Sequence, residues 1–326
     1  MKPLLVTMGD AAGIGPEIIV KAFESGAFDG CIAVGDPAVL RRAGAPMTAV
    51  IDTPADALAV PTGCLPVIAP PGLPAGLASL PWGRIDARCG AAAARCIEHA
   101  VTCIQAGQAG PLVTAPVHKE ALAAAGVPFP GHTEMLQSLA AAGGPLPPVR
   151  MMLANPELRV VLVTIHQSLR AAIDAVSFDA VLSTIRIAHA ASAAWGQRRP
   201  RIAVAGLNPH AGEGGLFGSE ELQIIAPAVQ AACAEGIAAS GPYAPDTVFM
   251  RARRGEFDLV IAMTHDHGLI PVKYLGVEEG VNVTLGLPFV RTSPDHGTAF
   301  DIAGQGKADP ASMLAAIRMA RALGQC

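Results

Sequence analysis

Three short apolar runs that each lead into a histidine constrain the fold of this chain more than any other feature. The clearest lies in Asp258–Lys273, DLVIAMTHDHGLIPVK, whose first half is apolar, begins at a charge and is too short for a helix core. The segments Arg159–His166 and Arg201–His210 have the same form. Runs of this kind predict strands that are buried on both faces, as in the sheet of an α/β protein.

The three predicted strands would bring His166, His210 and His265 to the same edge of the sheet. Open α/β sheets bind their ligands outside the carboxyl ends of the strands. Three neutral imidazoles with open positions form a familiar catalytic site for zinc and similar divalent ions, so we predict one metal ion here. For any one of them alone, a histidine hydrogen-bonded at a strand end is the structural alternative. His267 would face away from His265 on extended backbone and is the weaker candidate.

The composition is that of a globular protein with two domains. The chain has 326 residues, of which 15% are charged and 51% apolar, enough for two cores. A formal net charge of −4 without a basic stripe argues against a nucleic-acid partner. The longest uncharged run, 57–83, is broken by prolines and cannot form a membrane-spanning helix. The first apolar stretch is too short for a signal peptide and the cysteines form no CxxC pair, so we expect a reduced, cytoplasmic protein.

The glycine-rich segment Gly9–Glu17 follows the first predicted strand and leads into a helix. Its spacing is not GxGxxG, which disfavours a standard dinucleotide-binding loop and favours a structural strand-to-helix turn. Asp10 in this segment is either a polar contact for a ligand or a helix cap.

Two further segments carry groups suited to an anion. The strand predicted at 110–115 ends in the cation pair His118-Lys119. The segment Gly131–Glu134 opens a helix, where His132, Thr133 and free backbone N–H groups would form an anion cradle. The structural alternative is Thr133 as an ordinary N-cap.

Polar residues of the last third of the chain complete the candidate set. The glycine-rich loop 208–215 brings His210 to the strand ends, and Gly241–Thr247 is predicted to be a stiff turn that presents Asp246. Asn282 and Arg291 bracket another predicted strand. Arginine is the side chain best matched to a phosphate or carboxylate.

These motifs together resemble the 4-hydroxythreonine-4-phosphate dehydrogenase family of pyridoxal phosphate biosynthesis. They follow one another in the family's order over nearly the whole chain: Gly13–Glu17, Pro116–Lys119, Gly131–Glu134, Asn208–Glu213, His265-Asp266 and Arg291–Gly297. The resemblance implies that one divalent metal, zinc, magnesium or cobalt, is bound by the three histidines. It also carries the family's substrate contacts over to His132, Thr133, Lys273, Asn282 and Arg291.

The resemblance further implies two α/β/α domains with a cleft, like those of isocitrate and isopropylmalate dehydrogenases. We expect residues 1–128 with 285–326 to form the first domain and 129–284 to form the second. NAD or NADP would be the oxidant, and a homodimer would carry its active sites at the subunit interface. The implied reaction oxidises C3 of 4-phosphooxy-L-threonine and releases carbon dioxide, which gives 3-amino-2-oxopropyl phosphate. Asp246 and Lys119 are the hypotheses for the general base.

Alternative functions remain open at this stage. Family members usually have Tyr and Gln where this chain has Thr264 and His267, and often Pro where it has Ala11. These departures bear on substrate identity, and relatives oxidise threonate or erythronate 4-phosphate, or terephthalate-type cis-dihydrodiols. An intact set of phosphate-binding residues makes the dihydrodiol the weaker choice. A three-histidine metal hydrolase and a non-catalytic metal- or phosphate-binding protein are the readings outside this enzyme class.

Overall fold

The computed structural model describes residues 2–194, 196, 199–276 and 278–324. The chain divides into two compact units, the first up to Pro147 together with the segment from Leu287 onward, and the second Pro148–Gly286. The first boundary lies after residue 147 and not at the predicted 128. The reason is that the helix at 132–141 packs against a helix of the first unit, with Gln105 Nε2 donating to the Leu139 carbonyl at 2.9 Å.

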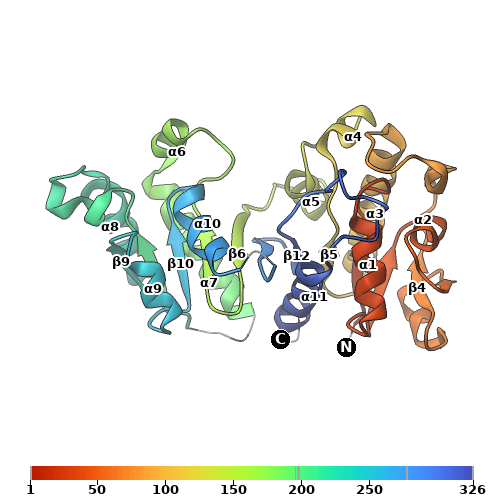
Figure 1. Cartoon of the computed structure of the whole chain (residues 1–326). Coiled ribbons are helices and arrows are strands. Elements are labelled where there is room, and N and C mark those ends of the chain that lie inside the picture. Colours follow the sequence, from red (N-terminus) through yellow and green to blue (C-terminus); the bar gives the residue numbers. More distant parts are fainter. Residues whose placement is uncertain (1, 195, 197–198, 277, 325–326) are drawn as a thin grey trace. The chain divides into compact units, whose positions relative to one another are not determined.

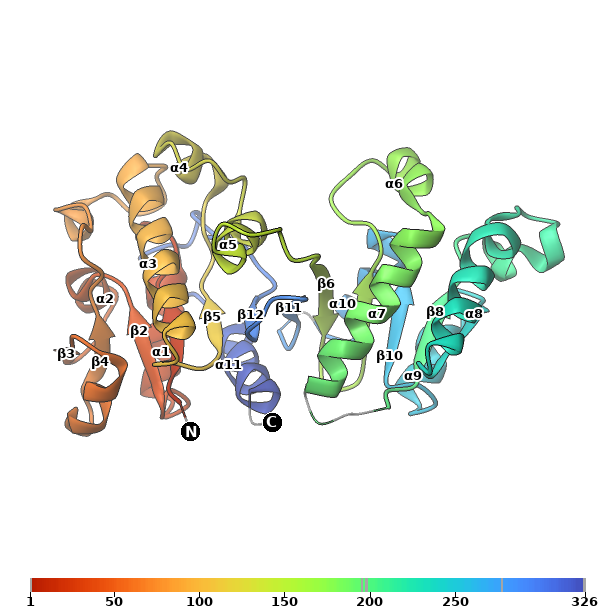
Figure 2. The ribbon, with the colours of Figure 1, turned by 180° about the vertical axis from the view of Figure 1, so that it is seen from behind.

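The first unit is built on parallel strands in the order β3-β4-β2-β1-β5-β12. They are β1 Leu4–Thr7, β2 Cys31–Val34, β3 Thr48–Val50, β4 Leu65–Ile68, β5 Leu112–Thr114 and β12 Arg291–Pro294. Its α-helices are α1 Gly15–Glu24, α2 Pro37–Arg42, α3 Ala87–Gln105, α4 Lys119–Ala124, α5 His132–Ala141 and α11 Ala311–Leu323, with short 3-10 turns at Pro54–Ala59 and Leu77–Ser79. Figure 1 shows α1 and α11 in front of these strands, and Figure 2 shows α3 in front of the opposite face.

The second unit has the strand order β11-β6-β7-β10-β8-β9, in which β6 is antiparallel to both neighbours. Its strands are β6 Arg150–Ala154, β7 Arg159–Leu162, β8 Ile202–Ala205, β9 Ala239–Tyr243, β10 Leu259–Ala262 and β11 Val281–Leu285. Its helices are α6 Leu169–Ala175, α7 Phe178–Ala194, α8 Ala226–Ala234, α9 Val248–Arg253 and α10 His265–Tyr274, with a 3-10 segment at Pro209–Gly215 and a π-helical turn at Glu221–Ile225. In Figure 2, α7 and α8 lie in front of this unit's strands, whereas α10 and α9 face the viewer in Figure 1.

The apolar runs that predicted strands are confirmed. The residues of β8 and β10 are all buried, and β7, β10 and β8 are parallel neighbours, so their carboxyl ends share one edge. The chain turns between β6 and β7, where Asn155 Oδ1 accepts hydrogen bonds from the N–H groups of Glu157 and Leu158. Short strands buried on both faces are read reliably from local sequence because burial requires an uninterrupted apolar run.

Three local predictions are wrong. The segment predicted as a stiff turn from Gly241 is partly strand, since β9 continues to Tyr243 and only the following residues turn. Asn282 and Arg291 do not bracket one strand, because Asn282 lies within β11 and Arg291 begins β12. The backbone at His267 is not extended, because α10 begins at His265. In each case the strand pairing or the helix extends beyond the residues whose sequence pattern indicated it.

The three cysteines of α3 belong to the buried core. Cys89, Cys96 and Cys103 are all buried on α3, as small apolar residues at seven-residue spacing on a helix are expected to be. Across the described residues, no helix is long and apolar enough to cross a membrane.

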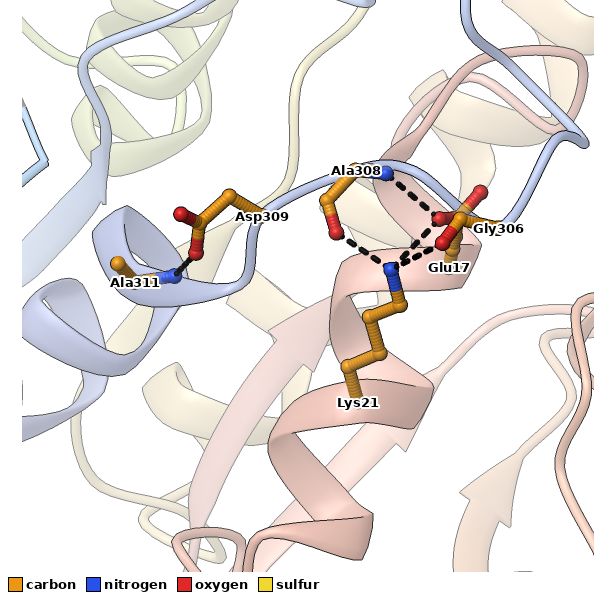
Figure 3. Close-up of polar contacts among 6 residues, drawn as sticks. All are labelled: Glu17, Lys21, Gly306, Ala308, Asp309 and Ala311. Carbon is orange, nitrogen blue, oxygen red and sulfur yellow. Dashed lines mark hydrogen bonds and ion pairs between the residues drawn. The ribbon is translucent and has the colours of Figure 1, made fainter.

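The segment between β12 and α11 is fastened to α1 by a buried charge (Figure 3). Lys21 Nζ donates to Glu17 Oε1 at 2.9 Å, to the Gly306 carbonyl at 2.9 Å and to the Ala308 carbonyl at 2.6 Å. The Ala308 N–H in turn donates to Glu17 Oε1 at 2.8 Å. Because the Glu17 side chain is only 6% exposed, these bonds are poorly screened and hold the segment in place.

Candidate active site

The second unit brings two of the three predicted metal ligands together. The rings of His166, just after β7, and His265, at the start of α10, have centroids 5.6 Å apart. His265 Nδ1 lies 2.8 Å from Asp266 Oδ1, a hydrogen bond that orients the ring and leaves Nε2 as the nitrogen for a ligand. His166 has φ 33°, in the left-handed region that a side chain with a Cβ disfavours. Strain of this kind is concentrated at functional sites.

The third predicted ligand, His210, lies on the strained loop after β8. His210, Ala211 and Glu213 have φ values of 53°, 53° and 45°. The loop is fixed at its base by the buried Glu221, whose Oε1 accepts from the N–H groups of Leu207 and Asn208 at 2.7 Å each. Burial opposes ionisation of Glu221, but the hydrogen bonds from Asn208 and the backbone outweigh it, so its pKa is lowered. A carboxylate therefore holds this strained backbone in place.

The three histidines do not form one cluster within a single chain. Among the residues that the structure describes, no group of three or more His, Cys, Asp or Glu side chains is close enough together to hold a metal ion. His210 instead lines a pocket of about 660 Å³ together with Asp246, Asp266 and His267. His210 is thus an exposed residue of the pocket that also contains Asp246, one of the two hypotheses for the general base, while His166 and His265 form a pair.

The remaining polar residues of the second unit are more open. Lys273 is exposed in the last turn of α10, and Asn282 is half-buried in β11. Pocket residues Met250, Ile270 and Tyr274 are 46%, 63% and 89% exposed, so the pocket wall is apolar and open to solvent in one chain.

The first unit contains the predicted anion cradle at the start of α5. Gly131 is the N-cap, and within the described residues no side chain caps this helix. Thr133 therefore is not the N-cap, and the structural alternative for it is wrong. Burial first, and the nearby charge of Arg291 second, lower the pKa of His132 well below its ordinary value, so the imidazole is neutral at pH 7. A neutral imidazole, a hydroxyl and uncapped N–H groups meet there.

Arg291, at the start of β12, places a buried cation in the same unit. It is only 4% exposed, and its Nη2 and Nε donate to Thr114 Oγ1 at 2.6 Å and 3.2 Å. Burial lowers its pKa to about 10, so the guanidinium stays protonated at neutral pH. No sequence motif indicated this contact between Thr114 and Arg291. A threonine at the last position of a strand was the available signal, but it is common and says nothing about its partner.

Asp10 and His118 lie near the carboxyl ends of β1 and β5. Asp10 is 1% exposed and its Oδ1 accepts from the Ala12 N–H at 2.8 Å. It does not cap α1, whose N-cap is Ile14, so the helix-cap alternative is wrong. Burial raises the pKa of Asp10, and the neighbouring His118 partly offsets this. The His118 ring stacks on Phe300 with centroids 4.7 Å apart, while Lys119 is exposed at the start of α4.

Comparison with known proteins identifies the family. The model of the pyridoxal phosphate biosynthetic protein PdxA matches residues 28–320. A 4-hydroxythreonine-4-phosphate dehydrogenase from Beijerinckia indica is 54% identical over 98% of this chain and 95% of the relative. A D-threonate 4-phosphate dehydrogenase from Pectobacterium atrosepticum is 46% identical over 99% of both chains. The crystal structure of a 4-hydroxythreonine-4-phosphate dehydrogenase from Klebsiella pneumoniae has a TM-score of 0.90 and 44% identity, and the match covers 100% of this chain and 98% of that one.

The resemblance found in the sequence is therefore confirmed, and so is the mixed α/β fold that it implied. Relatives named as dehydrogenases that match over nearly the full length overturn the alternatives of a metal hydrolase and of a non-catalytic binding protein. The chain belongs to the PdxA family and is an oxidoreductase.

Proposed function

We propose that this enzyme oxidises C3 of 4-phosphooxy-L-threonine with NAD or NADP and a divalent metal, followed by loss of carbon dioxide to give 3-amino-2-oxopropyl phosphate. The observation that carries the proposal is the anion cradle of the first unit, where the buried Arg291 lies close enough to His132 to lower its pKa. A buried cation beside an uncapped helix N-terminus suits a phosphate group.

The phosphate would be held by Arg291, His132 and Thr133. Arg291 supplies the charge, His132 is neutral and can donate one hydrogen bond, and Thr133 supplies a hydroxyl in the first turn of α5. Binding energy from a remote dianion can position the reacting carbon, which favours a phosphorylated substrate over a dihydrodiol that has no such group. Lys273 and Asn282 would contact the rest of the substrate.

The metal would be held by His166, His210 and His265. Three imidazoles suit zinc or cobalt, and the hydrogen bond that His265 Nδ1 donates to Asp266 Oδ1 is the orienting contact that such ligands commonly have. When bound, the ion would acidify the substrate hydroxyl and polarise the carbonyl that forms before decarboxylation.

We further propose that two chains share each metal site. His166 and His265 form a pair in one chain, and among the described residues no group of three or more His, Cys, Asp or Glu side chains is arranged to hold a metal ion. His210 lies on an exposed loop beside an open apolar pocket wall. The homodimer that the family resemblance implies would let His210 of one subunit complete the pair of the other, which accounts for an incomplete site in a single chain.

Asp246 is the better of the two general-base hypotheses. It lines the same pocket as His210, whereas Lys119 belongs to the other unit. In this role Asp246 would accept the proton of the substrate hydroxyl as hydride leaves C3 for the nicotinamide ring. Asp246→Asn keeps the shape of the side chain and removes its basicity, so it should lower kcat far more than it raises KM.

D-threonate 4-phosphate is the second candidate substrate. The relative from Pectobacterium atrosepticum that is named for it matches 99% of both chains, so the likeness to that dehydrogenase extends over nearly the whole length. The two substrates share the phosphate, the carboxylate and the C3 hydroxyl, and they differ at C2, where one has an amino group and the other a hydroxyl. Erythronate 4-phosphate presents the same groups.

Steady-state kinetics with each of the three phosphorylated acids, using NAD and then NADP, test the proposal. We expect 4-phosphooxy-L-threonine to have the highest kcat/KM and carbon dioxide to be released in step with reduced nucleotide. A higher value for D-threonate 4-phosphate would replace the substrate and leave the enzyme class intact. Equal turnover of the unphosphorylated acids would overturn the role of the anion cradle.

A further inference from the structure

We infer that Thr114 is a positioning residue, which holds the guanidinium of Arg291 in the orientation that receives the substrate phosphate. The inference rests on the proposed phosphate-binding role of Arg291. It adds a residue for which neither the motifs nor the family resemblance gives a role.

The strand register explains why these two residues meet. β5 and β12 are parallel neighbours in the first unit, with Arg291 opposite Leu112. Thr114 lies two residues beyond Leu112 and therefore on the same face of the sheet as Arg291. The long arginine side chain extends toward the carboxyl end of β5, where Nη2 and Nε both reach Thr114 Oγ1.

Thr114 is itself fixed. It is 0% exposed, and β5 lies between β12 on one side and β1 on the other, where Thr7 is its partner. A β-branched side chain on a central strand has few rotamers, so Oγ1 is a fixed acceptor. Nε and Nη2 of Arg291 both donate to this one fixed oxygen, so the two hydrogen bonds together set the orientation of the guanidinium plane.

The chemistry of the acceptor matters as much as its position. A carboxylate at this point would pair with the guanidinium and compete with the phosphate for its charge. A hydroxyl is neutral, so Thr114 orients Arg291 and leaves its positive charge for an anion. The neighbouring neutral His132 likewise adds no competing negative charge.

The test compares Thr114→Val with a matched control in the same sheet. Thr292 follows Arg291 on β12, is also 0% exposed and donates from Oγ1 to the Ala316 carbonyl at 2.9 Å, on the face away from Arg291. Both changes to Val remove one buried hydroxyl from neighbouring strands of the same sheet. Thr114→Val should raise KM for the phosphorylated substrate about tenfold with kcat nearly unchanged, the effect of losing a hydrogen bond to a charged group. Thr292→Val should leave KM as it is, and Thr114→Ser should restore it.

Binding of inorganic phosphate gives a second readout. Phosphate should raise the Tm of the wild-type chain and of Thr292→Val, and should raise that of Thr114→Val much less. Should Thr114→Val not fold, Thr114→Ala makes the same comparison. The inference would be overturned if the folded Thr114→Val or Thr114→Ala variant had the KM of the wild type. It would also be overturned if Thr292→Val raised KM as much as the Thr114 variant does.

Arg291→Lys separates the failure of this inference from failure of the proposed function. If Arg291→Lys leaves KM and the effect of phosphate on Tm unchanged, the phosphate role of Arg291 is wrong. If Arg291→Lys raises KM and Thr114→Val does not, only the positioning role of Thr114 is wrong.

Discussion

The anion cradle of the first unit and the histidines of the second unit differ in how far one chain prepares them. Arg291 is buried and bonded to a rigid strand, and His132 starts a regular helix. His265 belongs to a side chain pair that is partly exposed, and His210 lies on a loop with left-handed backbone. One chain therefore preorganises the proposed phosphate site, whereas the proposed metal site needs further groups to complete it.

Alanine at His210 or at His265 gives the largest expected effect and tests whether each of these histidines is a metal ligand. Each change should lower kcat at least about a thousandfold while the fold persists, because metal chemistry contributes several kcal/mol to the transition state. Circular dichroism and kinetics measure the two quantities. Near-normal turnover of the folded His210→Ala variant would refute its role as a ligand.

Mixing the two inactive variants extends this test. If two chains share each site, a hybrid dimer of His210→Ala and His265→Ala has one site with all three ligands. Refolding the mixture should then restore about a quarter of wild-type activity, from random pairing of symmetric subunits. No recovery from mixtures shown to contain hybrid dimers would mean that all three ligands come from one chain.

Removal of the metal tests the histidine site of the second unit without an amino-acid substitution. A chelator should abolish turnover, and zinc or cobalt should restore it better than magnesium, because imidazole ligands favour these ions over magnesium. The affinity of the metal-free protein for inorganic phosphate, measured by the rise in Tm, should change little. If removal of the metal also abolished phosphate binding, the two regions would not be independent and the comparison between them would fail.

Arg291→Lys tests the anion cradle of the first unit. Lysine keeps the charge and loses the planar fork, so KM for the phosphorylated substrate should rise roughly thirtyfold, the cost of about 2 kcal/mol expected for a charged hydrogen bond. Turnover at saturation should fall much less. An unchanged KM would show that the phosphate binds elsewhere.

Asp10→Asn should give the smallest effect and tests whether burial in the first unit carries a cost in stability. Burial raises the native pKa of Asp10 above its ordinary 3.8, so the native state binds more protons than the unfolded state between these two values. The free energy of unfolding therefore falls as the pH rises through this window, by about 1.4 kcal/mol for each pH unit that separates them. Asn keeps the Oδ1 acceptor for Ala12 and has no such loss. Urea unfolding at pH 4 and pH 7 should show the variant gaining on the wild type at pH 7, and parallel pH profiles would contradict it.

Much of the fold was predictable because its signals are local. The buried strands before His166, His210 and His265 follow from short apolar runs, and the start of α5 follows from its composition. Beyond those signals the sequence was less informative. β9 continues past Gly241 because β8 lies beside it to pair with, and α10 begins at His265, so His267 does not have the extended backbone that had ranked it lower.

The sequence by itself determined the family, the strands and the identity of the candidate ligands, because these depend on residue types and short spacings. Only the tertiary structure decided which groups meet. Thr114 and Arg291 are 177 residues apart in the chain, and the register of two parallel strands brings them together. His166 and His265 become neighbours through the pairing of β7 with β10, whereas His210 joins a pocket with Asp246. Contacts of this kind arise from long-range packing, which no local pattern of residues specifies.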